Sequence, residues 1–265
     1  MELRDHTILL TGATGGLGQA IARELARRGA ALILTGRRAD VLDPLAAETG
    51  GHAIVCDLGD AGDLERLLEA VGADVDALVA NAGLPGSGHI SSFSVEEIDR
   101  ALAVNLRAPM VMAARLAGPM VARGAGHLLF VSSLSGLAAS GGGSVYSATK
   151  FGLRGFAHAL RDDLRDSGVG VSVVLPGFIR EGGMFHESGT RLPRFVGTRT
   201  PEDVAEAVAR AIEDDRAEIG VAPLGLRAGA AFGGLMPELS ARIQRRLGGG
   251  RIAQDMARGQ RDKRS

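Results

Sequence analysis

The chain is short of the residues behind several common kinds of protein chemistry. In 265 residues it has no tryptophan, one tyrosine, Tyr146, and one cysteine, Cys56. A single cysteine excludes a disulfide within the chain and fits a reducing compartment, so we expect a cytoplasmic protein. The six histidines have no metal-ligand spacing and no Cys-x-x-Cys pair occurs, so no metal site is expected.

The chain also has no large excess of positive or negative charge and no long apolar run. The formal net charge is −1, so no overall field attracts nucleic acid, and none is expected as a partner. No apolar stretch approaches the ~20 residues of a membrane span. Arg4 and Asp5 precede only a short apolar run, so we expect no signal peptide. The 45% of hydrophobic residues is enough to fill a sizeable core.

Short apolar segments alternate along the chain with segments of helical periodicity. This alternation predicts an α/β fold with a doubly wound parallel sheet of the Rossmann type. We assign residues 1–223 to this single domain and residues 224–265 to a helical, basic C-terminal extension. The expected strands are residues 7–11, 31–35, 52–56, 77–80, 128–131, 169–175 and 217–222.

A long helical region is expected in the middle of the chain. Residues 94–97 form a capping box that starts it. The region carries Asn105 and runs to about Arg123. Pro109 is expected to break or kink it, because proline lacks an N–H and clashes with the preceding turn.

A glycine-rich turn, residues 12–18, joins the first strand to the first helix. Glycines let the backbone approach a phosphate closely, and the helix N-terminus adds free N–H groups. The alternative is a plain tight turn, but the placement between strand and helix is what a dinucleotide site requires. The candidate cofactor residues here are Gly12, Thr14, Gly16, Leu17 and Gly18.

The end of the second strand indicates which dinucleotide is bound. An acid there would bind a free ribose 2′-hydroxyl, whereas an arginine accommodates a 2′-phosphate. Gly36 is followed by Arg37 and Arg38, and the nearest acid, Asp40, more readily opens the next helix. NADP(H) is therefore favoured over NAD(H). The alternative is that both arginines are solvated turn residues.

The segment from Ser132 to Lys150 holds a hydroxyl, a phenol and an ammonium. Ser133 lies thirteen positions before Tyr146, and Lys150 lies four after it, on the same face of an expected helix. A cation beside a phenol should lower its pKa from about 10, which would make a general acid and base. A surface Tyr–Lys pair is the alternative. That Tyr146 is the only tyrosine favours the catalytic interpretation.

Over residues 5–222 the sequence resembles the short-chain dehydrogenase/reductase family, in its shorter reductase branch. The pattern T-G-x-x-x-G-x-G is met from Thr11 to Gly18, although Gly15 also satisfies the pattern of the longer, epimerase-rich branch. The N-A-G of residues 81–83 and the S…Y-x-x-x-K spacing select the shorter branch.

The resemblance implies hydride transfer between NADP(H) and a small-molecule carbonyl/alcohol pair. Tyr146 would exchange the proton, Lys150 would support it, Ser133 would hold the substrate oxygen, and Asn105 would hold a relay water. It also implies a homodimer or homotetramer. The further cofactor contacts that it implies are Asp57, Leu58, Asn81, Ala82, Gly83, Pro176, Gly177 and Ile179, together with Tyr146 and Lys150.

One position departs from the family pattern. Glu181 stands where the family often has a threonine that contacts the nicotinamide carboxamide. The loop of residues 178–199 is apolar with interspersed arginines, among them Arg191 and Arg194, and also carries Phe195, which favours a hydrophobic substrate. The alternative function is a non-enzymatic nucleotide sensor on the same fold, which would not need the catalytic residues.

The C-terminal extension has an amphipathic pattern and a positive charge. Residues 242–265 contain eight Arg/Lys and two Asp, and apolar residues recur every fourth position at Leu235, Leu239, Ile243 and Leu247. Pro237 suits the first turn of a helix. Packing over the substrate pocket or a neighbouring subunit is favoured, and contact with an anionic membrane surface is the alternative.

Overall fold

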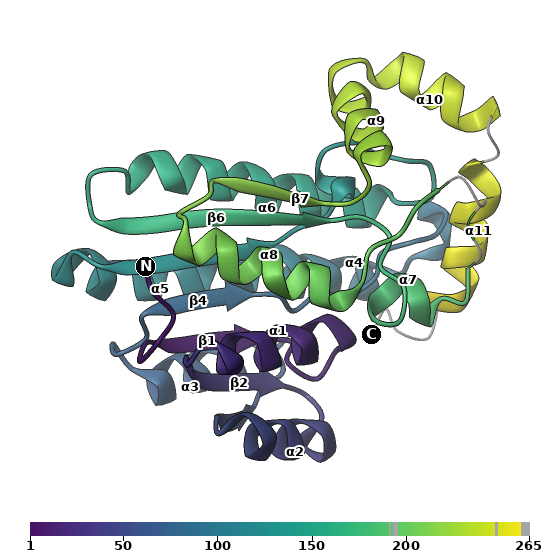
Figure 1. Cartoon of the computed structure of the whole chain (residues 1–265). Helices are drawn as coiled ribbons and strands as arrows, with labels where there is room; N and C mark the ends of the chain where they lie inside the picture. The colour runs from purple at the N-terminus through teal and green to yellow at the C-terminus, as the bar shows by residue number, and fades with distance from the viewer. Residues whose placement is uncertain (191, 193–195, 247–248, 261–265) are drawn as a thin grey trace.

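A seven-stranded parallel sheet forms the centre of the molecule in the computed structural model, which describes residues 1–190, 192, 196–246 and 249–260 (Figure 1). The strand order is β3-β2-β1-β4-β5-β6-β7, so the predicted doubly wound parallel sheet is confirmed. The strands are β1 (Thr7–Thr11), β2 (Ala31–Gly36), β3 (His52–Val55), β4 (Ala77–Ala80), β5 (Gly126–Val131), β6 (Val169–Pro176) and β7 (Glu218–Val221).

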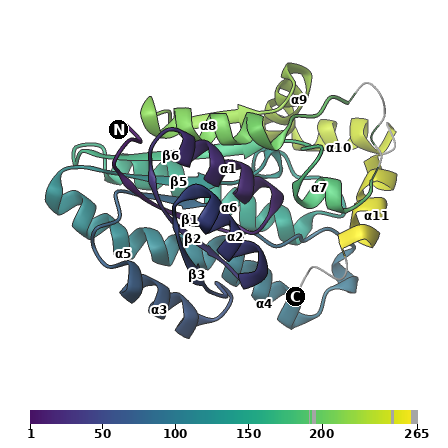
Figure 2. The ribbon, with the colours of Figure 1, turned by 60° about the horizontal axis from the view of Figure 1, so that its bottom comes forward.

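Helices cover both faces of the sheet (Figure 2). One face packs against α1 (Gly16–Arg27), α2 (Ala39–Thr49) and α8 (Pro201–Glu213). The other packs against α3 (Ala61–Val71), α5 (Ala108–Arg123) and α6 (Ser144–Asp163). The central strands therefore bury side chains on both faces: within β5, Leu129 enters the first core and Leu128 the second.

The helical region that carries Asn105 has three parts. They are α4 (Val95–Leu102), the π-helical turn η2 (Ala103–Arg107), and α5. The Ser94 capping box that starts α4 is confirmed. The change of helical geometry comes at η2, one turn earlier than the predicted break, and Pro109 lies in the first turn of α5, where proline is tolerated.

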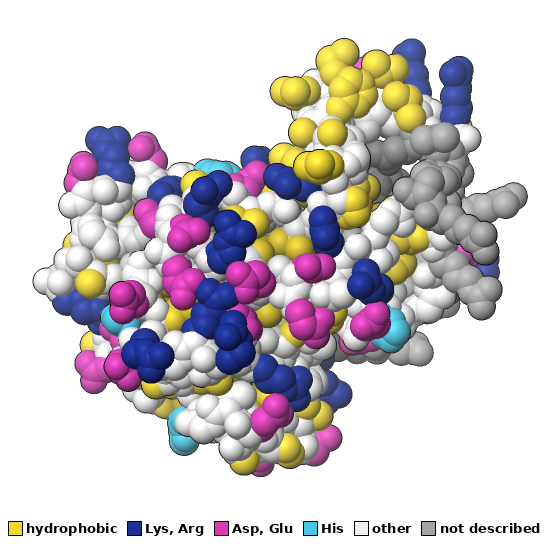
Figure 3. Space-filling model, in the orientation of Figure 1, with side chains coloured by type: hydrophobic (Ala, Val, Ile, Leu, Met, Phe, Trp, Pro, Cys, Tyr) yellow, Lys and Arg dark blue, Asp and Glu magenta, His cyan; other side chains and the backbone are white. Residues whose placement is uncertain are grey.

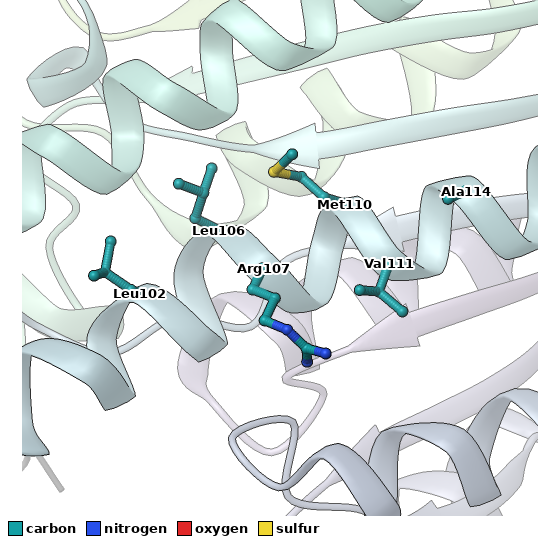
Figure 4. A pocket seen from close by; sticks show the side chains of 6 residues that line it. All are labelled: Leu102, Leu106, Arg107, Met110, Val111 and Ala114. Carbon is teal, nitrogen blue, oxygen red and sulfur yellow. The ribbon is translucent and has the colours of Figure 1, made fainter.

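The outer side of this region carries a surface cavity of about 340 Å³ (Figure 4). Its walls are almost entirely apolar. The lining residues are Leu102, Leu106, Arg107, Met110, Val111 and Ala114. Leu102 and Met110 are exposed, as is Phe151 on the neighbouring helix α6. The α5–α6 side of the molecule therefore presents apolar surface to solvent.

Short helices follow β6, where little regular pattern was expected, and β7, where a helical extension was expected. The loop after β6 contains α7 (Gly183–Glu187), and the extension contains α9 (Leu224–Leu235), α10 (Pro237–Arg246) and α11 (Gly249–Gln260). Figure 1 shows α11 beside α7, and Gln260 Nε2 donates to the carbonyl oxygen of Met184 at 2.9 Å. Only α10 was predicted from the sequence; Arg191, Arg194, Phe195 and Leu247 lie outside the described residues. No described helix has the length and apolar character needed to cross a membrane.

Candidate functional site

The turn between β1 and α1 is shaped for close approach of a ligand. Gly12 has a φ of +65°, and a Cβ on it would lie 2.7 Å from Ala82 Cα. A Cβ on Gly18 would lie 2.1 Å from the carbonyl oxygen of Gly12. Gly15 precedes α1 and offers no side chain to cap it, so N–H groups of the first turn can receive an anion. These features fit the pyrophosphate of a dinucleotide.

Thr11 ties this turn to the segment after β4. Its Oγ1 accepts hydrogen bonds from the N–H groups of Asn81 and Ala82, both at 3.1 Å. Asn81 Nδ2 in turn donates to the Thr11 carbonyl oxygen at 3.0 Å. The sequence pattern contained Thr11, but its bridging role depends on the β1–β4 pairing, which spacing along the chain does not reveal.

The two arginines after β2 lie beside the same turn. Arg38 Nη2 donates to the carbonyl oxygen of Thr14 at 2.5 Å, and a Cβ on Gly36 would lie 2.8 Å from Thr14 Cγ2. Both arginines are exposed. Asp40 lies in the first turn of α2, as predicted. The end of β2 is therefore followed directly by two exposed arginines, and the acid nearest in sequence belongs to α2.

Asp57, after β3, is held by a residue that the sequence did not indicate. Its Oδ2 accepts from Arg100 Nη2 at 2.6 Å, and its Oδ1 accepts from the Gly59 N–H at 2.9 Å. Burial opposes ionisation, but these bonds prevail and hold the pKa of Asp57 below its ordinary value. Arg100 lies 43 residues away in sequence, so no local pattern could identify it. The Leu58 side chain is buried in the core, which leaves its backbone for a ligand.

Asn105 is fully buried, and both ends of its amide bond to the chain. Oδ1 accepts from the Leu84 N–H at 2.6 Å, and Nδ2 donates to the Leu84 carbonyl oxygen at 2.9 Å. Nδ2 also lies 3.3 Å from Thr149 Oγ1, which donates to the Tyr146 carbonyl oxygen at 2.8 Å. Asn105 therefore links η2, the segment after β4 and α6. Its role in holding a relay water stays a prediction.

Ser133, Tyr146 and Lys150 come together at the carboxyl ends of the central strands. Ser133 follows β5, and its hydroxyl lies close enough to the Tyr146 phenol to lower the pKa of that phenol. The Ser133 Oγ also accepts from the Ser135 N–H at 3.1 Å, which orients it. Lys150 Nζ lies 5.6 Å from the centroid of the Tyr146 ring and donates to the Val131 carbonyl oxygen at 3.0 Å.

The predicted lowering of the Tyr146 pKa is wrong for this structure. Burial raises the pKa of Tyr146 to about 12, and the hydrogen bond from Ser133 offsets only part of that rise. Burial also lowers the pKa of Lys150 to about 8. The ammonium is directed at a carbonyl oxygen rather than at the phenol, so the loss of solvent outweighs its attraction for a phenolate.

Comparison with known proteins shows the family of the chain. The family model described as short chain dehydrogenase matches residues 6–192. The chain belongs to the short-chain dehydrogenase/reductase family. It is therefore an NAD(P)-dependent oxidoreductase acting on alcohol/carbonyl pairs.

Named relatives and solved structures give the extent of the similarity. "Ketoacyl reductase HetN" of Nostoc sp. is 34% identical over 226 residues, 82% of this chain and 78% of that protein. "NADP-dependent 3-hydroxy acid dehydrogenase YdfG" of Salmonella typhi is 33% identical over 221 residues, 76% of this chain and 86% of that protein. A short-chain dehydrogenase from Sphingobium yanoikuyae, solved with NADPH, has a TM-score of 0.77 at 30% identity, over 89% of this chain and 95% of that chain.

The segment after β6 departs from the family pattern in its sequence and contains a residue in the left-handed conformation. Pro176 ends β6, Gly177 follows, and Ile179 is buried. Glu181, where the family often has threonine, has a φ of +66° and an exposed side chain that pairs with Arg180 at 3.1 Å. Its carboxylate therefore faces solvent.

The same segment covers the glycine-rich turn of residues 12–18. A Cβ on Gly16 would lie 2.9 Å from the Gly183 nitrogen, so α7 begins against the glycine-rich turn. Met184 follows, and its Cε lies 3.3 Å from the position of a Cβ on Gly83. Lys150 Nζ lies 3.6 Å from that position. The thioether of Met184 is thus a neighbour of the candidate catalytic groups that the sequence did not indicate.

Proposed function

We propose that this chain reduces a carbonyl group on a small hydrophobic molecule, with NADPH favoured over NADH. The single observation that carries the proposal is that Ser133, Tyr146 and Lys150 come together, with Lys150 buried beside the Tyr146 ring. The names of two relatives, a ketoacyl reductase and an NADP-dependent hydroxy acid dehydrogenase, support it. We further propose a cytosolic location, since the lone cysteine, Cys56, is a free thiol.

In the proposed reaction NADPH supplies the hydride when it is bound. Tyr146 gives its phenolic proton to the carbonyl oxygen of the substrate. A pKa of about 12 keeps this phenol protonated near neutral pH, so it is ready to donate. Ser133 donates to the same substrate oxygen and stabilises the charge that develops there. Reduction is the direction that uses the protonated phenol.

The proposed cofactor contacts are those expected from the family, with one addition. The turn of residues 12–18 would hold the pyrophosphate, and the segments at residues 81–83 and 176–179 would line the nicotinamide side. Arg37 and Arg38 would pair with a 2′-phosphate, since guanidinium–phosphate contacts are strong. Arg100 would act as a positioning residue for Asp57, whose carboxylate it holds at 2.6 Å.

Apolar side chains near the site support the hydrophobic substrate. The rings of Phe178 and Phe185 lie 5.0 Å apart between centroids, and Met184 of α7 lies beside the candidate catalytic groups. Such a lining favours an alkyl or aryl ketone over a charged sugar.

The proposal is tested by following NADPH absorbance with a panel of ketones of graded hydrophobicity. We expect turnover that rises with the apolar surface of the ketone and disappears in Tyr146→Phe. A protein that binds NADPH tightly but turns over none of the panel would instead favour the nucleotide sensor. Binding of NADPH is measured separately by calorimetry, so the two outcomes are distinguished.

A further inference from the structure

Helix α9 is apolar and yet exposed along most of its length. Of its twelve residues only Ala230 and Gly233 are buried, and Arg227 is its one charged residue. Leu224 and Leu235, at its two ends, are 78% and 82% exposed. Soluble monomers rarely leave a contiguous apolar surface uncovered, so such a helix marks an interaction surface.

Helix α10 continues this surface and adds charge to it. Leu239 and Ile243 lie one turn apart and are each 43% exposed. Arg242, Arg245 and Arg246 are exposed on the same short helix. Figure 3 shows hydrophobic side chains gathered over α9 and α10, with Lys and Arg side chains at the far end. We call this surface the α9–α10 patch; its apolar residues are Leu224, Phe232, Leu235, Met236, Leu239 and Ile243.

Helix α9, one half of the patch, lies next to the candidate active site. Helix α9 packs on η3 (Leu134–Gly136), the turn that follows Ser133. A Cβ on Gly234 would lie 2.8 Å from the Leu137 carbonyl oxygen, so the two backbones nearly touch. Whatever covers the patch therefore also lies near the segment that follows Ser133.

The charge of the patch indicates the chemistry of its partner. Residues 224–246 contain four arginines and one glutamate, a balance of +3, whereas the chain as a whole carries −1. The remaining residues therefore carry −4, so the patch is positively charged while the rest of the chain has a net negative charge. A two-fold contact between two copies would bring the three arginines of α10 towards each other. An anionic lipid surface would instead pair with them.

We propose that the α9–α10 patch docks on the surface of an anionic membrane. The six apolar side chains would enter the boundary between headgroups and acyl chains, while Arg242, Arg245 and Arg246 contact the headgroups. Docking would not require a spanning segment, and it does not depend on the reaction proposed above. It would bring the segment that follows Ser133 close to the bilayer, in which apolar molecules dissolve.

The test uses the full chain and sedimentation with vesicles of phosphatidylcholine, with and without phosphatidylglycerol. We expect binding at low salt that needs the anionic lipid and weakens as salt is added. Arg242→Gln, Arg245→Gln and Arg246→Gln together should weaken the partition coefficient about 100-fold, at about fivefold per arginine. Leu235→Asp with Leu239→Asp should abolish binding.

The matched control is Val95→Glu, which places a charge on an equally exposed apolar side chain far from the patch. Val95 is 68% exposed and lies in the first turn of α4, where an acid is favourable. It should bind vesicles as the unaltered chain does. Circular dichroism and NADPH binding show whether each variant is folded, and Arg242→Lys, Arg245→Lys and Arg246→Lys together should restore binding.

Three results would overturn the proposal. The first is failure of the unaltered chain to sediment with anionic vesicles at low salt. The second is binding of the aspartate variant as strong as that of Val95→Glu. The third result would be a lower mass for the aspartate variant in light scattering without lipid, since a second copy would then cover the patch.

Discussion

The Lys150 ammonium lies beside the Tyr146 ring, 5.6 Å from its centroid, but gives its hydrogen bond to the Val131 carbonyl oxygen at 3.0 Å. The two groups are neighbours without being partners. Lys150 is buried and Tyr146 is half-buried, and each is pushed towards its neutral form: the pKa of Tyr146 rises to about 12 and that of Lys150 falls to about 8. Their spacing along the helix brings them close together, and burial shifts both of their pKa values.

The first prediction follows from the single tyrosine. Because the chain has no tryptophan, the near-ultraviolet phenolate band reports Tyr146 alone. In the cofactor-free protein we expect little phenolate at a pH of about 10, where an ordinary tyrosine is half ionised. The band should develop only at higher pH, or abruptly when the chain unfolds. A circular dichroism signal recorded in parallel separates these two events.

Two variants identify the groups that set this pKa. Ser133→Ala removes a hydrogen bond that lowers it, so the midpoint should move higher still. Lys150→Met should move it little, because the ammonium bonds elsewhere. A native midpoint below 10, or a large upward shift in Lys150→Met, would show that the cation governs the phenol after all.

The second prediction concerns turnover. Tyr146→Phe removes the proton donor and should lower kcat by about 10²–10⁴, the usual contribution of general acid catalysis. Ser133→Ala should cost about 10²–10³, as for loss of one donor to a developing charge. NADPH binding by both variants should stay within a few-fold of the unaltered chain. Full activity in Tyr146→Phe would remove this constellation from the mechanism.

The third prediction separates the two arginines after β2. Arg37→Ala should weaken NADPH about 10- to 100-fold and leave NADH nearly unchanged, because only NADPH has the 2′-phosphate. Arg38→Ala should weaken both cofactors, because Arg38 also holds the Thr14 carbonyl oxygen of the glycine-rich turn. Calorimetric titration of both cofactors at fixed salt measures the difference. Equal affinities for NADPH and NADH in the unaltered chain would contradict the cofactor preference.

The fourth prediction concerns stability in mild acid. His127 is buried in β5, and burial lowers its pKa from 6.5 to about 4, against the attraction of Asp215 and together with the repulsion of Arg161 and the N-terminus. The Ser172 hydroxyl donates to the Arg216 carbonyl oxygen at 2.6 Å, so His127 Nε2 donates to Ser172 Oγ at 2.9 Å. At neutral pH the folded protein holds His127 as the neutral ring, with its proton on Nε2.

A lowered histidine pKa means that the unfolded chain binds the extra proton first. Stability from this group is fully present above pH 6.5 and is lost as the pH falls towards 4, by about 3 kcal/mol in total. Urea unfolding at several pH values measures the loss. His127→Gln, which does not titrate, should be less stable at neutral pH but should flatten the curve in this window. An unchanged slope would exclude His127 as its origin.

The fifth prediction concerns assembly. The cavity around Leu106 and the exposed Leu102, Met110 and Phe151 leave apolar surface on the α5–α6 side. A second copy of the chain would cover it, so we expect a homodimer or homotetramer. Met110→Asp with Phe151→Asp should reduce the mass in light scattering to that of one chain, 27.3 kDa. A native mass of one chain at micromolar concentration would contradict this.

Sequence patterns anticipated the parts of the fold that depend on local physics. The strands were predictable because residues such as Leu128 and Leu129 are buried on opposite faces of one sheet. The Tyr146–Lys150 pair was predictable because positions four apart share a helix face. The direction of the Tyr146 pKa shift was not, because burial is a property of the whole fold.

Local sequence patterns could not predict the long-range contacts or the bounds of the glycine-rich helix. Arg100 reaches Asp57 across 43 residues, and Thr11 bonds to Asn81 across 70. Helix α9 contains four glycines, which lower intrinsic helix propensity, so its bounds could not be predicted within the expected helical extension. Met184 joins the site only because α7 folds back over the glycine-rich turn.

The π-helical turn at Asn105 makes the length of the chain matter at this point. An α-helix advances by about 100° per residue, and a wider turn holds one residue more, so side chains beyond it are rotated relative to an unbroken helix. Deleting one residue between Ala103 and Arg107 would restore a smooth helix. It would also swing either Asn105 away from Leu84 or the inner side of α5 away from the sheet. The chain can accept a changed residue in this turn more readily than a missing one.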